Sequence, residues 1–318
     1  MTGLQLIGTG RALPERCVTN DELSLTVDTS DAWISERTGI RNRYFCGEGE
    51  STVTLAVAAA RQAMQDAGIA PEQIACCICA TVSGDYATPS VACMVQAELG
   101  LPEDIPVLDV NAACSGFLYG TVTAAGLLEN CGGDYALVIG CEQLSRLLDM
   151  TDRSTCVLFG DGAGAAVYRR ENGKPLASCL GARGSKAIVA QGPGPEASKI
   201  GMDGRAVFRF AVEAIPHCLH ETLAKAGKTL DEVDWVVCHQ ANARIIDHCV
   251  KKLGAPPEKF YKNIDRYGNT SAASIPMALR DMREAGLLKN GQTVLCIGFG
   301  GGLTWAGVLL TVSMGDDE

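Results

Sequence analysis

Cys114 is the residue whose surroundings best fit a nucleophile. It lies in VLDVNAACSGF (107–117), where a predicted strand over 106–110 runs through small residues into a helix that begins near position 115. A thiol at the start of a helix faces the positive end of the helix dipole and unpaired backbone N–H groups. These groups favour the thiolate and offer donors to an oxyanion. On the local sequence alone, a buried structural cysteine is an equally good interpretation.

Two polar residues later in the chain are candidate partners of this cysteine. His239, one of four histidines, opens HQANARI directly after an apolar stretch, and Asn269 lies in the turn GNTSAASIP (268–276). A histidine at the end of a buried strand is placed like a catalytic group. The alternatives are a hydrogen-bonded core histidine and an asparagine that only caps its turn or helix. A glycine run at 299–302 can present a bare backbone N–H to a ligand, or form a flexible hairpin.

Internal repetition indicates which elements hold these residues. A predicted helix over 51–67 and a later helix end at glycines 159 positions apart, and half of the chain is 159 residues. Predicted strands that end in Gly140 and Gly298 are 158 positions apart. We therefore predict two related α/β halves, 1–172 and 173–318, each with a mostly parallel, buried sheet. The alternative is a chance alignment between ordinary α/β segments.

The offset of 159 also relates the candidate residues to one another. It places Asn269 opposite position 110, in the loop that carries Cys114. Open α/β sheets bind ligands at the carboxyl ends of their strands. Two halves packed face to face would bring such loops to one shared cleft, so the sequence predicts a site built from both halves.

Composition limits the class of protein. The 318 residues include 27 Lys and Arg against 37 Asp and Glu, a net charge of −10, which argues against nucleic acid or an anionic membrane as the main partner. Fifteen cysteines, an odd number spread through apolar stretches, do not form a disulfide framework. No signal peptide or membrane-spanning stretch is evident. We expect a cytoplasmic enzyme with reduced thiols.

Several motifs together resemble one family. AACSGF, HQANARI, YGNTSAASIP and FGGGLTWAG occur in the order and spacing of a β-ketoacyl-acyl-carrier-protein synthase III, and the similarity also covers 30–43 and 151–168. Asn269 stands where the related elongating synthases have a second histidine, which selects the initiating class. The resemblance implies a thiolase-like fold, in which duplicated α/β halves pack as a layered α-β-α-β-α sandwich. It also implies a homodimer.

The resemblance further implies a mechanism. Cys114 takes the acyl group from an acyl-CoA primer, and malonyl-acyl carrier protein then loses CO₂ and attacks the acyl-cysteine. His239 and Asn269 would donate hydrogen bonds to the thioester oxygen during decarboxylation. The backbone N–H groups of Cys114 and Gly301 would form the oxyanion hole. No cofactor is implied, because the CoA thioester is a substrate and CoA is a product.

Matching positions extend to the CoA site. By resemblance, Trp33 and Arg153 sandwich the CoA adenine, which suits an indole and a guanidinium. The resemblance assigns further contacts with CoA or pantetheine to Arg37, Gly204, Phe208 and Asn242. Without the resemblance, Trp33 is better interpreted as a packing residue on an amphipathic helix.

Three basic residues suggest where the acidic carrier protein binds. Arg244, Lys251 and Lys252 share one face of a predicted helix over 244–253, and the family match agrees. Equally, the two lysines simply complement the carboxyl end of that helix. Thr88 stands where short-chain members carry phenylalanine, at the floor of an acyl tunnel contributed across a dimer interface. We therefore expect room for a longer or branched primer.

Other chemistry and other functions remain as alternatives. Cys76 and Cys79 have a metal-like spacing, but a strand points them to opposite faces, and nothing completes a site around His217 and His220. No metal is therefore expected. The rival functions are a condensing enzyme of secondary metabolism, a cysteine hydrolase with the same three residues, and a non-catalytic partner subunit. The last would be expected to have lost Cys114.

Overall fold

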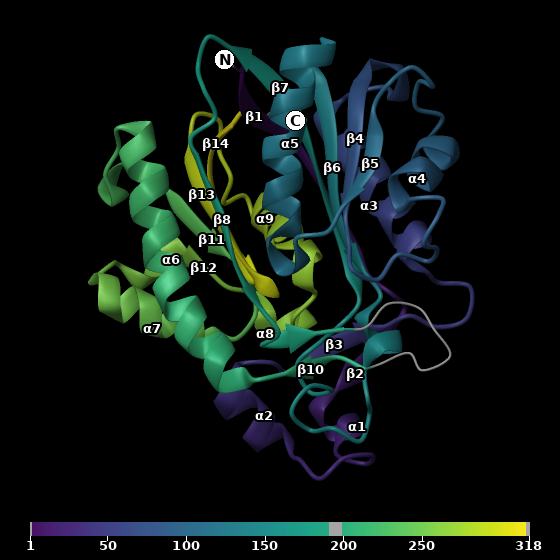
Figure 1. The fold of residues 1–318 in the computed structure, drawn as a ribbon, viewed down its shortest axis with the longest axis vertical. Coiled ribbons are helices and arrows are strands. Elements are labelled where there is room, and N and C mark those ends of the chain that lie inside the picture. The colour runs from purple at the N-terminus through teal and green to yellow at the C-terminus, as the bar shows by residue number, and fades with distance from the viewer. Residues whose placement is uncertain (1, 191–198, 316–318) are drawn as a thin grey trace.

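Two similar arrays of strands form the centre of the fold (Figure 1). The computed structural model describes residues 2–190 and 199–315. In the first array the order is β5 (Val107–Val110), β4 (Ile74–Ala80), β6 (Tyr135–Glu142), β7 (Gly162–Asn172) and β1 (Thr2–Ala12). In the second it is β12 (Phe260–Tyr261), β11 (Trp235–Cys238), β13 (Thr293–Gly300), β14 (Gly302–Val312) and β8 (Ser178–Ser185). The shared order confirms the predicted duplicated α/β fold.

The two arrays contact each other through a short parallel pairing. Gln5 pairs with Thr311 and Leu6 with Val312, so β1 and β14 link the arrays into one sheet. Within each array the first three strands run parallel, and β7 and β14 run antiparallel to their neighbours β6 and β13. The sheet is therefore mixed, although the sequence predicts a mostly parallel one.

Helices form three layers around these strands (Figure 1). The outer layers are α3 (Thr52–Ala67) with α4 (Val91–Leu99) on one array, and α6 (Gly204–Ala226) with α7 (Ala243–Leu253) on the other. Between the arrays lie α5 (Gly116–Cys131) and α9 (Ser274–Glu284), packed in the largest apolar core. This is the expected α-β-α-β-α order.

Shorter elements complete the described part of the chain. They are β2 (Arg16–Thr19), α1 (Asn20–Leu23), α2 (Asp31–Thr38), β3 (Asn42–Phe45), β9 (Ile188–Val189), β10 (Gly201–Met202), α8 (Ile264–Tyr267) and the short 3₁₀ turns η1 (Pro71–Gln73), η2 (Ala113–Ser115), η3 (Leu144–Leu147), η4 (Leu230–Glu232), η5 (Pro257–Lys259) and η6 (Ser271–Ala273). Both η2 and η6 lead directly into a central helix, and they pack against each other.

Local signals in the sequence are confirmed at the helix ends. The Ser51 side chain accepts from the backbone N–H of Thr54, and Gly68 closes α3 in the left-handed conformation at a φ of 64°. Strand ends are less well predicted. The strand expected to stop at Gly140 continues to Glu142, because Glu142 still pairs with Gly162 on β7.

Two glycines let the central loops press against the sheets. A Cβ atom at Gly140 would lie 2.2 Å from the carbonyl oxygen of Ala272, and one at Gly298 would lie 3.1 Å from the Cα of Ser115. These are the equivalent positions of the two arrays, 158 residues apart. Each array therefore supports the loop that comes from the other half of the chain.

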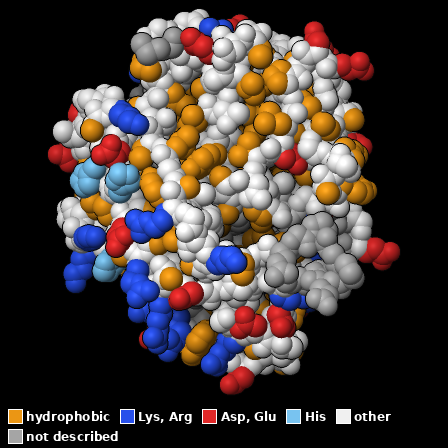
Figure 2. Space-filling view, viewed as in Figure 1, with side chains coloured by type: hydrophobic (Ala, Val, Ile, Leu, Met, Phe, Trp, Pro, Cys, Tyr) orange, Lys and Arg blue, Asp and Glu red, His pale blue; other side chains and the backbone are white. Residues whose placement is uncertain are grey.

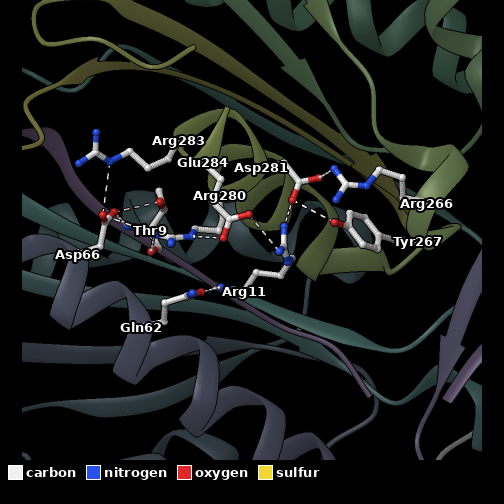
Figure 3. A network of polar contacts seen from close by, with 10 residues as sticks. All are labelled: Thr9, Arg11, Gln62, Asp66, Arg266, Tyr267, Arg280, Asp281, Arg283 and Glu284. Atoms are coloured by element: carbon white, nitrogen blue, oxygen red, sulfur yellow. Dashed lines mark hydrogen bonds and ion pairs between the residues drawn. The ribbon is translucent and has the colours of Figure 1, made fainter. Parts of the chain in front are cut away.

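A network of charged side chains around the buried Asp281 also joins the two halves (Figure 3). Asp281 on α9 contacts Arg11 on β1 and accepts from Arg266 at 2.8 Å and from the Tyr267 hydroxyl at 3.1 Å. Asp66 on α3 joins the same network through ion pairs to arginines of α9. The network therefore fixes α8, directly before the Asn269 turn, to the first half.

Replacing Asp281 with alanine should lower the free energy of unfolding by about 3 kcal/mol, because it leaves the buried Asn263 amide and Tyr267 hydroxyl without their acceptor. Urea denaturation followed by circular dichroism measures this. Glu22→Ala is the control, since its ion pair with Arg16 is largely exposed and should contribute little. Equal effects of the two substitutions would contradict the assigned role of Asp281.

Candidate active site

One cavity of about 1150 Å³ receives residues from both halves of the chain. Its walls come from the loop after β4, the η2 and η6 turns, the end of β11 and the β13–β14 turn. Cys114, His239 and Asn269 all line it. The duplicated fold thus brings together three candidate residues that lie as much as 155 positions apart in the sequence.

Cys114 lies in a sharp turn at the start of a central helix. Ala113 before it has a φ of 47°, a left-handed conformation that few residues with a side chain adopt. A Cβ atom at Gly300 would lie 2.7 Å from the Cβ of Cys114, so only glycine allows this approach. The backbone N–H groups of Gly301 and of Cys114 itself interact with the sulfur and lower its pKa. The two predicted oxyanion donors therefore face the same atom.

The ionisation of this thiol differs from the expectation. Burial, together with the charge of Glu142, raises the pKa of Cys114 to about 11, against the lowering by the Ser271 hydroxyl and the backbone donors. The sequence predicts that the helix start and its N–H groups favour the thiolate, and the backbone N–H groups do lower the pKa of the thiol, but burial has the larger effect. Loss of water around the sulfur outweighs the dipole and the donors. The thiol therefore keeps its proton at neutral pH and needs an acceptor.

His239 is a buried, neutral imidazole. Its Nδ1 lies 2.7 Å from the Ser274 hydroxyl oxygen, which accepts the backbone N–H of Gln240 at 3.3 Å. The Ser274 hydroxyl can then donate to Nδ1, so the ring proton is placed on Nε2. Burial lowers the pKa of His239 to about 3, which keeps the ring neutral at physiological pH. In this state Nε2–H can donate a hydrogen bond but cannot accept a proton.

Asn269 has its carbonyl oxygen engaged and its amide left to donate. Its Oδ1 accepts the backbone N–H of Ser271 at 2.9 Å. Its backbone donates to the carbonyl of Leu158 and accepts from Gly160, which ties the turn to the first half. The side-chain NH₂ group is the one available to a ligand in the cavity.

The structural counterpart of Asn269 is position 111, one residue from the predicted position 110. Ser271 has a φ of 49° and matches Ala113, which has a φ of 47°, at an offset of 158. Because the turns and the strand ends share that offset, Asn269 corresponds to Asn111. The predicted offset of 159, taken from helix ends, shifts this pair by one residue.

The predicted CoA residues fall into two groups. Gly204, Phe208 and Asn242 line the cavity, whereas Trp33, Arg37 and Arg153 do not. Those three form a stack nearby, with each guanidinium 4.9 Å from the centre of the indole ring. Arg153 occupies a ring face on which a base would stack, so a sandwich with adenine requires Arg153 to move.

The predicted carrier-protein residues lie exposed on α7. Figure 2 shows blue side chains gathered at the lower left, over α2, α7 and the beginning of α6. Arg244, Lys251 and Lys252 are exposed, and Lys252 also donates to the carbonyl of Val212 on α6. Thr88 is exposed and does not line the cavity of its own chain, although its neighbour Ala87 does.

Sequence reasoning missed three residues that contact the candidate groups. Ser274 orients His239, and Ser271 interacts with the sulfur of Cys114. Glu142 ends β6 as a buried carboxylate behind the same turn. A signal was present for each: the hydroxyls belong to the Asn269 turn, and Glu142 ends the otherwise apolar run YALVIGCE.

Among residues 2–190 and 199–315, no helix is long and apolar enough to cross a bilayer. Within the same ranges, no group of three or more His, Cys, Asp and Glu side chains is placed to hold a metal ion. His217 instead packs against Trp305, with ring centres 6.0 Å apart.

The duplicated halves, the central helices and the shared cavity define a thiolase-like α/β enzyme. Family sequence models for 3-oxoacyl-[acyl-carrier-protein (ACP)] synthase III match residues 108–184, and for its C-terminal part residues 223–312. The chain belongs to the β-ketoacyl-[acyl-carrier-protein] synthase III family, whose members are acyltransferases of the condensing type.

Individual relatives cover nearly the whole chain. A β-ketoacyl-[acyl-carrier-protein] synthase III of Rhizorhabdus wittichii is 49% identical over 94% of this chain and 96% of its own. The crystal structure of the Aquifex aeolicus 3-oxoacyl-[acyl-carrier-protein] synthase III is 43% identical, with a TM-score of 0.91 over 97% of this chain and all of its own. A priming β-ketosynthase from the R1128 polyketide pathway is 34% identical, with a TM-score of 0.92 over 98% of this chain and 96% of its own.

Proposed function

We propose that this chain condenses an acyl-CoA primer with malonyl-acyl carrier protein by a decarboxylative Claisen reaction and so initiates fatty-acid synthesis. The observation that carries the proposal is the meeting of Cys114, His239 and Asn269 in one cavity, in a chain of this family. A sulfur nucleophile, a neutral imidazole donor and an amide donor suit thioester chemistry.

In the priming step, the sulfur of Cys114 attacks the thioester carbonyl of the acyl-CoA. The oxygen gains negative charge and accepts hydrogen bonds from the backbone N–H groups of Cys114 and Gly301, which already face the sulfur. The tetrahedral adduct then expels CoA, and the acyl group stays on Cys114. A thiol of raised pKa must lose its proton in this step.

In the condensing step, malonyl-acyl carrier protein replaces CoA and loses CO₂. Nε2–H of His239 and the side-chain NH₂ of Asn269 donate to the thioester oxygen as the enolate forms. Neither group has to remove a proton, because the departing CO₂ leaves the electron pair behind. The enolate carbon attacks the acyl-cysteine carbonyl, and collapse of the adduct returns the sulfur and releases the 3-ketoacyl product. A neutral histidine suits this donor role.

Residues in and around the cavity suit the binding of CoA and of the acyl carrier protein. We assign CoA binding to the cavity residues Gly204, Phe208 and Asn242 and to the stack of Trp33 with Arg37 and Arg153. Asn242 links the two groups, because its Nδ2 donates to the carbonyl of Arg37 at 3.1 Å. The basic face of α7 would bind the acidic carrier protein.

Arg244→Glu should raise the Michaelis constant for malonyl-acyl carrier protein and leave priming by acyl-CoA almost unchanged. The reason is that the substitution reverses charge on the exposed basic face without touching the cavity. Separate steady-state assays with each substrate varied measure the two effects, and added salt should weaken carrier binding in the unchanged protein. An equal loss in both half-reactions would contradict the assignment.

The active form would be a homodimer. The edge of β5 away from β4 is unpaired among the described residues, and all four β5 residues are partly exposed. Figure 2 shows apolar side chains in the same region, over α5, β5 and β8, where Leu180 is 40% exposed. A second copy can pair β5 with itself around a two-fold axis, which covers this edge. Thr88 could then approach the acyl tunnel of the other copy.

Mass spectrometry after incubation with a panel of acyl-CoAs tests the function. We expect one acyl group retained on Cys114, and CO₂ release with a 3-ketoacyl product once malonyl-acyl carrier protein is added. Free acid and CoA without malonyl-acyl carrier protein would instead identify a hydrolase. The same panel tests the tunnel: strong preference for acetyl-CoA over octanoyl- or isobutyryl-CoA would contradict the expectation from Thr88. Product identity also separates fatty-acid initiation from polyketide priming.

A further inference from the structure

Glu142 is a buried carboxyl group that the steps above do not use. It is fully buried at the end of β6. No lysine or arginine forms an ion pair with it in the described ranges. A buried carboxylate without a cation is costly, so this residue requires an explanation.

Hydrogen bonds hold only one edge of this carboxyl group. Its Oε2 accepts from the hydroxyls of Ser83 and Thr81 and from the backbone N–H of Val82 at 3.1 Å. Its Oε1 is buried and has no hydrogen-bond partner within normal distance among the described residues. One oxygen is therefore fixed by the loop after β4, and the other is free to take a proton.

Ser271 connects this carboxyl group with the candidate nucleophile. It lines the cavity beside Cys114, and its hydroxyl interacts with both groups, lowering the pKa of the Glu142 carboxyl and of the Cys114 thiol. The η6 turn that carries Ser271 packs against both η2 and β6. A hydroxyl group accepts one proton as it gives up another, so it can pass a proton between its two neighbours.

His239, the other nearby group that could accept the proton, already uses both ring nitrogens. In His239, Nδ1 receives the Ser274 hydroxyl and Nε2 carries the ring proton. Its low pKa makes the ring a poor proton acceptor. The proton of the Cys114 thiol therefore has no acceptor among the three candidate catalytic residues.

We propose that Glu142 accepts the thiol proton of Cys114 through the Ser271 hydroxyl during priming. The thiol proton passes to the Ser271 oxygen as the Ser271 proton passes to Glu142, and the sulfur lone pair forms the bond to the thioester carbon. When the adduct collapses, the C–S bond to CoA breaks and its electron pair leaves with the CoA sulfur. The relay runs backwards and protonates that sulfur, which leaves Glu142 ionised again. Glu142 acts only through Ser271 and does not itself contact the substrate, so we class it as a positioning residue.

Charge coupling supports this exchange. The charge of Glu142 raises the pKa of two buried thiols, those of Cys114 and Cys141. Burial raises the pKa of Glu142 itself to about 7. Because each group opposes the ionisation of the other, the pair carries at most one negative charge near neutral pH, and a proton can move from the thiol to the ionised carboxyl without a new charge entering the site.

The inference rests on the proposed function, but its sharpest test needs no acyl-CoA. The rate of Cys114 alkylation by iodoacetamide is measured against pH by peptide mass spectrometry, with exposed Cys131 as the internal reference. Above a pH near 7 Glu142 is ionised and can take the proton, so the rate should rise there and then level off. An alkylation rate without this pH dependence would contradict the relay, whereas absence of acyl retention would contradict the proposed function. The two results can therefore be told apart.

Two variants test the relay. Glu142→Gln keeps the size of the side chain but cannot take the proton, and Ser271→Ala interrupts the path. Ala113, at the equivalent position, shows that this fold accommodates alanine in the same backbone conformation. In both variants we expect the inflection near pH 7 to disappear and acylation by acyl-CoA to slow by roughly 10²-fold. Condensation from enzyme that is already acylated should stay close to normal.

Two outcomes would overturn the inference. An inflection that persists in Glu142→Gln would show that another group takes the proton. Equal losses in acylation and condensation, with the alkylation profile unchanged, would show that Glu142 only supports the loops. Thermal melting establishes whether each variant is folded. If Glu142→Gln does not fold, Ser271→Ala still tests the relay.

Discussion

Replacing Cys114 with alanine should abolish acyl retention and condensation, with a loss of roughly 10³-fold or more in turnover. The reason is that no other thiol lines the cavity among the described residues. Decarboxylation of malonyl-acyl carrier protein should persist, because His239 and Asn269 remain in place. Intact-protein mass spectrometry measures retention, and a CO₂ assay measures decarboxylation.

The matched control is Cys131→Ala at the exposed end of α5. It removes a thiol at the far end of the helix that Cys114 precedes, without touching the cavity, and it should leave both activities unchanged. Acyl transfer by Cys114→Ala at a rate near that of the unchanged protein would mean that another residue carries the acyl group.

Asn269→Asp should lower the rate of decarboxylation by about 10²-fold to 10³-fold and leave priming nearly intact. The substitution keeps an oxygen that can accept the Ser271 N–H, so the turn is retained. It replaces the donating NH₂ with a group that repels the developing enolate. Release of CO₂ from malonyl-acyl carrier protein, measured apart from acylation by acyl-CoA, separates the two steps.

Asn130→Asp is the control for this charge change, because Asn130 lies exposed at the far end of α5 and bonds only locally. It should have no effect on either step. If Asn269→Asp slowed priming as much as decarboxylation, the side chain would be holding the cavity together and not stabilising an enolate.

Much of the fold could be predicted because local signals and repetition agree. The serine and glycine at the ends of α3 are caps with a known physical basis, and equal spacing between the halves revealed the duplication. The end of β6 could not be predicted in the same way. Pairing with β7 decides where that strand stops, and pairing is a long-range contact.

The candidate residues could be found, but their chemical state could not. Cys114 and His239 each follow a strand, which is visible in the sequence as an apolar stretch, and Asn269 lies in a turn that leads into a helix. The raised pKa of the thiol and the lowered pKa of the imidazole come from burial, which depends on the packed structure. Ser271 and Glu142 gained importance only because the fold brings them beside Cys114.

Equivalent positions in the two halves have different roles. At an offset of 158, Gly300 stands opposite Glu142 and Ala272 stands opposite Cys114. The glycine leaves room for a sulfur, whereas the glutamate fills the matching space and its counterpart turn carries only a methyl group. The two halves are related by repetition, but only one of them supplies a nucleophile. Each polypeptide can therefore carry one acyl group, and the equivalent position in the other half supports the structure instead.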